Sequence, residues 1–163
     1  MSNFLHWTDE QKINVIRQLV NKIGTPAQVI EKDLWVTAIL QIIFSLPFAE
    51  NLVFKGGTSL SKVWNAIERF SEDIDLAIDR QHFGYSGDLS VKQLKKLRKK
   101  SSLFVKDDFC KALQNAVNQH EIQNLCSIAV QPDGEGDNTY PEPRKIFVYY
   151  RSLFDKIDYI THQ

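Results

Sequence analysis

The chain has 163 residues, of which 43% are hydrophobic and 25% are charged, and its formal net charge is zero. This composition is typical of a globular protein that buries a core, and it excludes an extended disordered chain. Because the net charge is zero, a nucleic-acid partner would have to bind a local basic patch.

Two helices are expected in the first 48 residues. The first helix opens with a capping box at Thr8 and ends at Gly24. The second begins with Thr25 as its N-cap and Pro26 as its first helical residue, and it runs to about residue 46. Its second half is apolar around most of its circumference, which predicts a central buried helix.

The sequence predicts a cytoplasmic protein with no membrane partner. The most apolar run, residues 34–48, falls short of the ~20 apolar residues of a membrane span, and the N-terminus lacks the pattern of a signal peptide. The two cysteines, Cys110 and Cys126, have no metal-ligand spacing, so we expect two reduced, buried thiols.

A strand, a glycine turn, a helix and a second strand follow in order. Residues 51–55 are expected as a short strand, and Gly56-Gly57 form the turn after it. Residues 59–67 have the apolar spacing of a helix, and residues 73–79 alternate as the second strand.

The remainder of the chain is expected to be helical and then β-stranded. Residues 88–120 are predicted as helix, in two pieces around Ser101-Ser102. Residues 125–130 and 146–150 are predicted as strands, and the segment between them, rich in Pro, Gly and acids, as a loop.

The second strand of the unit carries two acids at alternate positions. Asp73 and Asp75 share one face, about 7 Å apart along the strand, while Ile74, Leu76 and Ile78 occupy the other. Two such carboxylates can hold hard divalent cations, as in phosphoryl and nucleotidyl transfer. The alternative is a half-exposed strand with an acidic solvent face, although acids are depleted in strands.

The glycine turn offers backbone N–H groups at the start of a helix, where phosphate binds favourably. It is not a P-loop, because Lys-Ser/Thr does not follow the second glycine at the required spacing. Thr58 or Ser59 could cap the helix and offer a hydroxyl to phosphate. Three cations bracket the turn and the helix as candidate triphosphate contacts: Lys55, Lys62 and Arg69. A plain strand-to-helix turn is the alternative.

A basic helix follows. Lys92, Lys95, Lys96, Arg98, Lys99, Lys100 and Lys106 provide seven cations, with no acid between Asp88 and Asp107. Such a patch, residues 92–100 above all, suits tRNA or another RNA backbone, and a solvated surface helix explains it equally simply. The interleaved aromatics that stack single-stranded bases are missing from this stretch.

Three segments together resemble a known family. The segments 54–63, 69–76 and 31–35 carry the strings FKGGTSLSKV, RFSEDIDL and EKDLW. They resemble the AbiEii/AbiGii toxin nucleotidyltransferases of the DNA polymerase β-like superfamily, to which the MenT group is related. The resemblance covers about residues 25–80 well and the remainder loosely.

The resemblance implies an α+β fold: a polymerase β-like nucleotidyltransferase core with a small mixed sheet, N-terminal helices and a helical insertion. It implies Mg²⁺ on Asp73 and Asp75, and an NTP whose phosphates contact Gly57, Thr58 and Ser71. It also implies a toxin of a type IV toxin–antitoxin or abortive-infection system with a cognate antitoxin, transferring NMP from NTP to RNA or protein.

The chain is expected to form one nucleotidyltransferase-like domain over residues 1–163. Its parts would be a helical segment 1–48, the glycine turn and Asp-x-Asp core 51–80, a helical segment 88–120 and strands in 125–163. The family usually has a further Lys-Ile-Glu-like strand and a C-terminal helical region, which we expect this chain to lack; Asp155 and Asp158 are the candidate third acids. The alternatives are a catalytically incomplete module that binds nucleotide or a partner, and an interaction protein with no nucleotide site.

Overall fold

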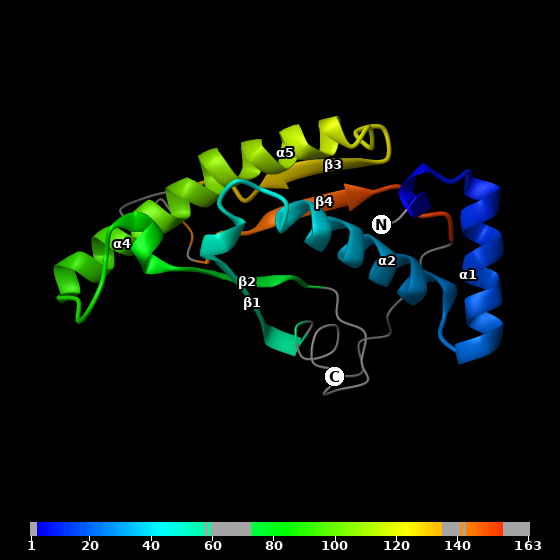
Figure 1. Ribbon diagram of the computed structural model, residues 1–163, viewed down its shortest axis with the longest axis horizontal. Helices are drawn as coiled ribbons and strands as arrows, with labels where there is room; N and C mark the ends of the chain where they lie inside the picture. Colours follow the sequence, from blue (N-terminus) through cyan, green and yellow to red (C-terminus); the bar gives the residue numbers. More distant parts are fainter. Residues whose placement is uncertain (1–2, 58, 60–72, 135–140, 142, 155–163) are drawn as a thin grey trace.

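The computed structural model describes residues 3–57, 59, 73–134, 141 and 143–154. Within these residues, helix α1 (Asp9–Ile23) lies at one end of the molecule and α4 (Val91–Phe104) at the other (Figure 1). Helix α2 (Ala27–Ile43) and two antiparallel pairs of strands lie between them. This mixture of helices and small sheets confirms the predicted α+β class.

The N-terminal helices begin and end close to where the sequence predicts. A short 3-10 helix, η1 (Asn3–His6), precedes α1, whose capping box joins Thr8 and Gln11 and whose C-cap is Gly24, at φ 69°. The N-cap of α2 is Pro26 and not Thr25, because Pro26 keeps an extended backbone at ψ 144°. Helix α2 ends at Ile43, three residues earlier than expected, and turns lead to η2 (Ala49–Asn51).

Helix α2 is the centre of the core. Nine of its seventeen residues are buried, so apolar side chains surround it on most sides, as the sequence predicts. Trp35 stacks on Tyr150 of strand β4 (Ile146–Tyr150), with 4.8 Å between ring centroids. The core therefore joins the N-terminal helices to the last described strand.

Each pair of strands is antiparallel. Strand β1 (Leu52–Lys55) pairs with β2 (Asp75–Ile78), and β3 (Cys126–Val130) pairs with β4. The side chains of Ile74, Leu76 and Ile78 pack against the core as predicted, but the strand is shorter than the expected 73–79: it begins at Asp75, so Asp73 and Ile74 precede it. Helix α5 (Cys110–Gln119) packs on β3 and on α2.

The helical stretch after η3 (Arg80–Phe83) is not divided where the sequence suggests. Helix α4 continues through Ser101 and Ser102, and the change comes at a π-helical turn, η4 (Val105–Phe109), which leads into α5. Ser102 is compatible with the helix because it is buried and donates its hydroxyl to Pro141 O at 2.8 Å.

A buried arginine ties the segments before and after the β3–β4 connection to α4. The Arg144 side chain donates to Ser102 Oγ at 2.9 Å and to Gln131 O at 2.7 Å, and it forms an ion pair with Asp133. Hydrogen bonds from Lys106 and Arg144 hold the pKa of Asp133 below its ordinary value. This network fixes one side of α4 against the rest of the molecule.

Cys110 and Cys126 are free and buried, as predicted, and burial raises the pKa of both thiols. Over the described residues, every helix is too short or too polar to cross a membrane.

Candidate functional site

The pairing of β1 with β2 places the glycine turn beside Asp75, the first residue of β2. Lys55, the last residue of β1, is the register partner of Asp75, the first residue of β2. A helix begins directly after β1, at Gly56 and Gly57, earlier than the predicted start at Ser59. Two motifs that lie 18 residues apart in the sequence, at Gly57 and Asp75, therefore meet at one end of the strand pair.

The contact between Gly56 and Asp75 is so close that only glycine fits. Gly56 has φ +76°, in the left-handed region that side chains other than glycine rarely adopt. A Cβ on Gly56 would stand 3.0 Å from both Cβ and Cγ of Asp75 and closer still to Oδ2. The Asp75 carboxylate consequently lies against the main chain of the turn.

The candidate residues differ in exposure. Lys55, Asp73 and Asp75 are exposed, whereas Ser59 is buried, at 6% exposure. Exposed carboxylates and an exposed lysine are accessible to a charged ligand, whereas the buried Ser59 is not. The other candidates lie outside the described residues: Thr58, Lys62, Arg69, Ser71, Asp155 and Asp158.

The donors present are compatible with a hard divalent cation. Asp73 and Asp75 supply carboxylate oxygens, and the space that a Gly56 side chain would fill is taken by the Asp75 carboxylate. Within the described parts of the chain, no third His, Cys, Asp or Glu joins them in a cluster. These two aspartates are the residues that would hold a metal ion here.

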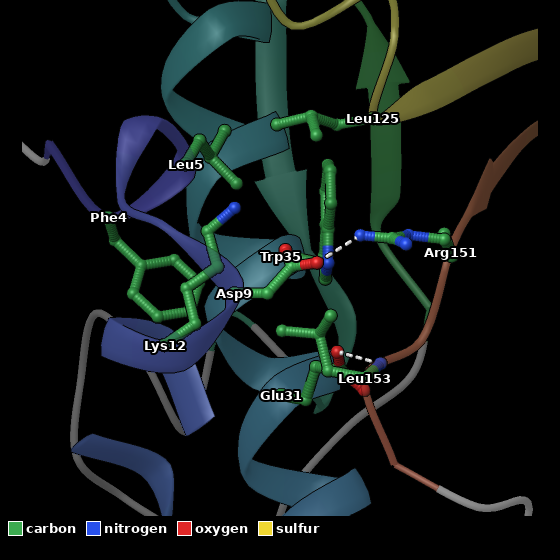
Figure 2. A pocket seen from close by; sticks show the side chains of 9 residues that line it. All are labelled: Phe4, Leu5, Asp9, Lys12, Glu31, Trp35, Leu125, Arg151 and Leu153. Atoms are coloured by element: carbon green, nitrogen blue, oxygen red, sulfur yellow. Dashed lines mark hydrogen bonds and ion pairs between the residues drawn. The ribbon is translucent and has the colours of Figure 1, made fainter. Parts of the chain in front are cut away.

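Glu31 has a structural role that the sequence left open. Its side chain is 2% exposed and accepts a hydrogen bond from Ser152 Oγ. It accepts another from Leu153 N at 2.9 Å (Figure 2). Arg151 forms an ion pair with Asp9 of α1 beside it. Two carboxylates of the N-terminal helices therefore hold the segment that follows β4.

A small pocket lies beside these contacts, and Lys12 lines it together with Glu31 and Trp35 (Figure 2). It is 6% exposed, and its ammonium lies 5.9 Å from the Phe4 ring centroid. Burial lowers the pKa of Lys12, while the neighbouring carboxylate of Asp9 acts in the opposite direction. The pocket is a charged contact between helices rather than part of the glycine-turn site.

The basic helix lies at the far end of the molecule from α1 (Figure 1). Helix α4 contains six of the seven predicted cations and no acid. The seventh, Lys106, lies in η4 and forms an ion pair with Asp133, so it belongs to the Arg144 network. The sequence does not reveal the aromatic side chains that pack beside this helix, because they come from η3 and from the segment after α2.

The comparisons with known proteins give a family. Comparison with curated proteins and with solved structures gave no match. The family model described as "Nucleotidyl transferase AbiEii toxin, Type IV TA system" matches residues 38–158 of the 163, a range that starts after Glu31 and extends well beyond residue 80. The chain belongs to this family of AbiEii nucleotidyl transferase toxins of type IV toxin–antitoxin systems.

Proposed function

We propose that the protein transfers a nucleoside monophosphate from an NTP to an acceptor RNA at the site formed by the glycine turn and the Asp73–Asp75 segment. The observation that carries the proposal is the approach of Asp75 to Gly56, which places a carboxylate against a main chain suited to phosphate. Membership of the family implies a nucleotide substrate and a cognate antitoxin.

Each residue has a chemical role in this proposal. The N–H groups at Gly56 and Gly57 would bind the triphosphate, and the exposed Lys55 would balance its charge. Asp73 and Asp75 would hold a divalent cation, which we take to be Mg²⁺; such an ion stabilises charge on the attacking and leaving oxygens. Thr58, Lys62, Arg69 and Ser71 remain candidate phosphate contacts, whereas the buried Ser59 does not.

The reaction would be an in-line displacement at the α-phosphorus. A hydroxyl oxygen of the acceptor RNA forms a bond to the α-phosphorus as the bond to the pyrophosphate oxygen breaks, and the hydroxyl proton passes to solvent. A tRNA 3′ end is the acceptor we would test first. We propose that the reaction takes place in the cytoplasm. We also propose that residues 1–163 form one domain.

Asp75→Asn tests the proposal. Because changes in residues that merely support metal ligands cost 10- to 100-fold, loss of a ligand itself should reduce transfer of radiolabelled NMP to total RNA by more than about 100-fold. Asp75 is exposed, so the melting temperature should change by less than about 2 °C. Asp88→Asn makes the same charge change at an exposed position of the loop before α4 and should leave transfer intact.

Three outcomes separate the possibilities. Transfer by the wild type and its loss in Asp75→Asn alone would support the proposal. If calorimetry detects NTP and Mg²⁺ binding without any transfer, the protein is a nucleotide-binding module. If Asp75→Asn unfolds the protein, the acid is structural and the proposed site is wrong.

A further inference from the structure

An open groove lies between η3 and the C-terminal end of α4. It encloses about 670 Å³, including solvent at its mouth, and its walls come from His82 and Phe83 of η3, from Lys100, Leu103 and Phe104 of α4, and from Asp107 and Asp108 of η4. None of these residues belongs to the glycine-turn site. The groove combines aromatic rings, a cation and two acids.

The aromatic wall is firmly anchored. The His82 ring lies 4.8 Å from the Phe104 ring, and Phe83 lies 5.6 Å from Phe104, both in edge-on contact. Phe104 in turn packs on Phe48 at 5.0 Å, which connects the wall to the core. His82 is exposed and Phe83 is half-buried, so their rings offer the groove a supported surface on which a planar ligand can stack.

The cationic wall is the side of α4 that faces the groove. Lys100, Leu103, Phe104 and Asp107 follow the i, i+3, i+4, i+7 spacing of one helical face, and Lys96 lies one turn earlier on the same face. Lys100 Nζ is held 3.5 Å from Phe83 O and 5.3 Å from the Tyr85 ring centroid. Lys100, the cation that lines the groove, therefore lies next to the aromatic residues.

The charges favour a nucleic-acid strand over an acidic peptide. Helix α4 carries six cations without an acid, which suits a phosphate backbone. Asp107 and Asp108 are exposed where the groove meets η4, and they would repel phosphates and peptide carboxylates alike, so that end of the groove suits the base of a nucleotide and not its phosphate. Their oxygens can accept hydrogen bonds from the exocyclic amines of cytosine and adenine.

We propose that this groove binds an unpaired base of a single-stranded nucleic acid by stacking on His82 and Phe83, with the adjacent phosphates on Lys96 and Lys100. The role as an acceptor site rests on the proposed function. Strand β2 begins at Asp75, a proposed metal ligand, and extends about 10 Å to Ile78. Helix η3, which lines the groove, begins two residues later at Arg80. The groove would hold the acceptor strand upstream of its reacting end.

Fluorescence anisotropy with labelled oligonucleotides, in buffer without NTP or metal, tests the groove. His82→Ala should weaken binding of a cytidine 12-mer by roughly 5- to 150-fold, the loss expected for one stacked base, and His82→Phe should restore it. Lys96→Ala and Lys100→Ala should each lower the slope of log K against log salt by about 0.7. Lys22→Ala, an exposed cation on α1, is the matched control and should change neither quantity.

The base preference and the nature of the partner are tested in the same assay. The cytidine 12-mer should bind more tightly than a uridine 12-mer, because uracil has no exocyclic amine for Asp107 or Asp108. If His82→Ala binds as wild type does, or if polyglutamate binds as tightly as the oligonucleotide, the inference is wrong.

The assay also separates this inference from the proposed transfer. Asp75→Asn should bind the oligonucleotide as wild type does, because the groove contains no part of the glycine-turn site. If the oligonucleotide binds by stacking but NMP is not transferred under any condition, the proposed function is refuted and the proposal for the groove stands. If His82→Ala transfers NMP to RNA as efficiently as wild type does, the groove is not the acceptor site and the proposed function stands.

Discussion

Replacing Gly56 with alanine would measure how strongly the close approach to Asp75 constrains the candidate site. The new residue would have to adopt φ +76°, which costs about 1–2 kcal/mol for a residue with a Cβ. The Asp75 side chain would also have to rotate away, at a cost of about 0.5–1.5 kcal/mol. The sum is about 1.5–3.5 kcal/mol, which corresponds to a melting temperature lower by roughly 3–14 °C in a chain of this size.

Gly24→Ala is the control, because Gly24 has φ +69° and no atom within 4 Å of the position of a Cβ. It should carry the backbone strain alone, about 1–2 kcal/mol. Urea unfolding of both variants gives the difference. In a double-mutant cycle, combining Gly56→Ala with Asp75→Gly should remove the part of the cost that comes from the carboxylate.

The same substitution has a functional consequence. Gly56→Ala retains both aspartates but displaces one carboxylate, so calorimetry should show weaker Mg²⁺ binding than in Gly24→Ala. The reasoning is refuted if Gly56→Ala costs no more stability than Gly24→Ala. It is also refuted if the coupling energy with Asp75→Gly is within about 0.5 kcal/mol of zero.

Two further predictions concern the polar contacts outside the site. Glu31→Ala should lower the free energy of unfolding by roughly 2–4 kcal/mol in urea titrations, because the Leu153 amide loses a charged, buried acceptor. Asp133→Asn should lower stability near neutral pH, since Lys106 and Arg144 depress the pKa of Asp133. That contribution is complete above the ordinary carboxyl pKa of about 3.9 and is lost as pH falls through the lower folded value, so wild type and variant should converge in acid.

Matched controls make both results interpretable. Glu10→Ala removes an exposed carboxylate from α1, and its effect should stay within about 0.5 kcal/mol; an equally small effect of Glu31→Ala would contradict the anchoring role. For Asp133→Asn, a stability gap that is unchanged between about pH 6 and about pH 2 would show that the ion pairs contribute nothing.

Local signals in the sequence predicted most of the elements. The capping box at Thr8, the glycine at position 24 and the alternation from Ile74 to Ile78 each depend on neighbours within a few residues, and each appears as expected. The break placed at Ser101-Ser102 was wrong because serine usually weakens a helix, whereas the Ser102 hydroxyl has a partner at Pro141, 39 residues later.

The candidate site was predicted as a set of residues but not as a geometry. The sequence identifies Gly56 and Asp75 separately, and their contact depends on the register of β1 against β2, which is a long-range property. The groove beside α4 was missed for a similar reason, since His82, Phe104 and Phe48 meet only in the folded chain.

The contacts of Glu31 and Asp9 bear on where this protein can be shortened. A chain that begins at residue 38, the first position of the family match, would start inside α2 and lose both carboxylates that hold residues 151–153. The folding unit of this chain is thus larger than the range that the family model matches. This chain cut at that boundary would expose the surface that α1 and the first turns of α2 now cover.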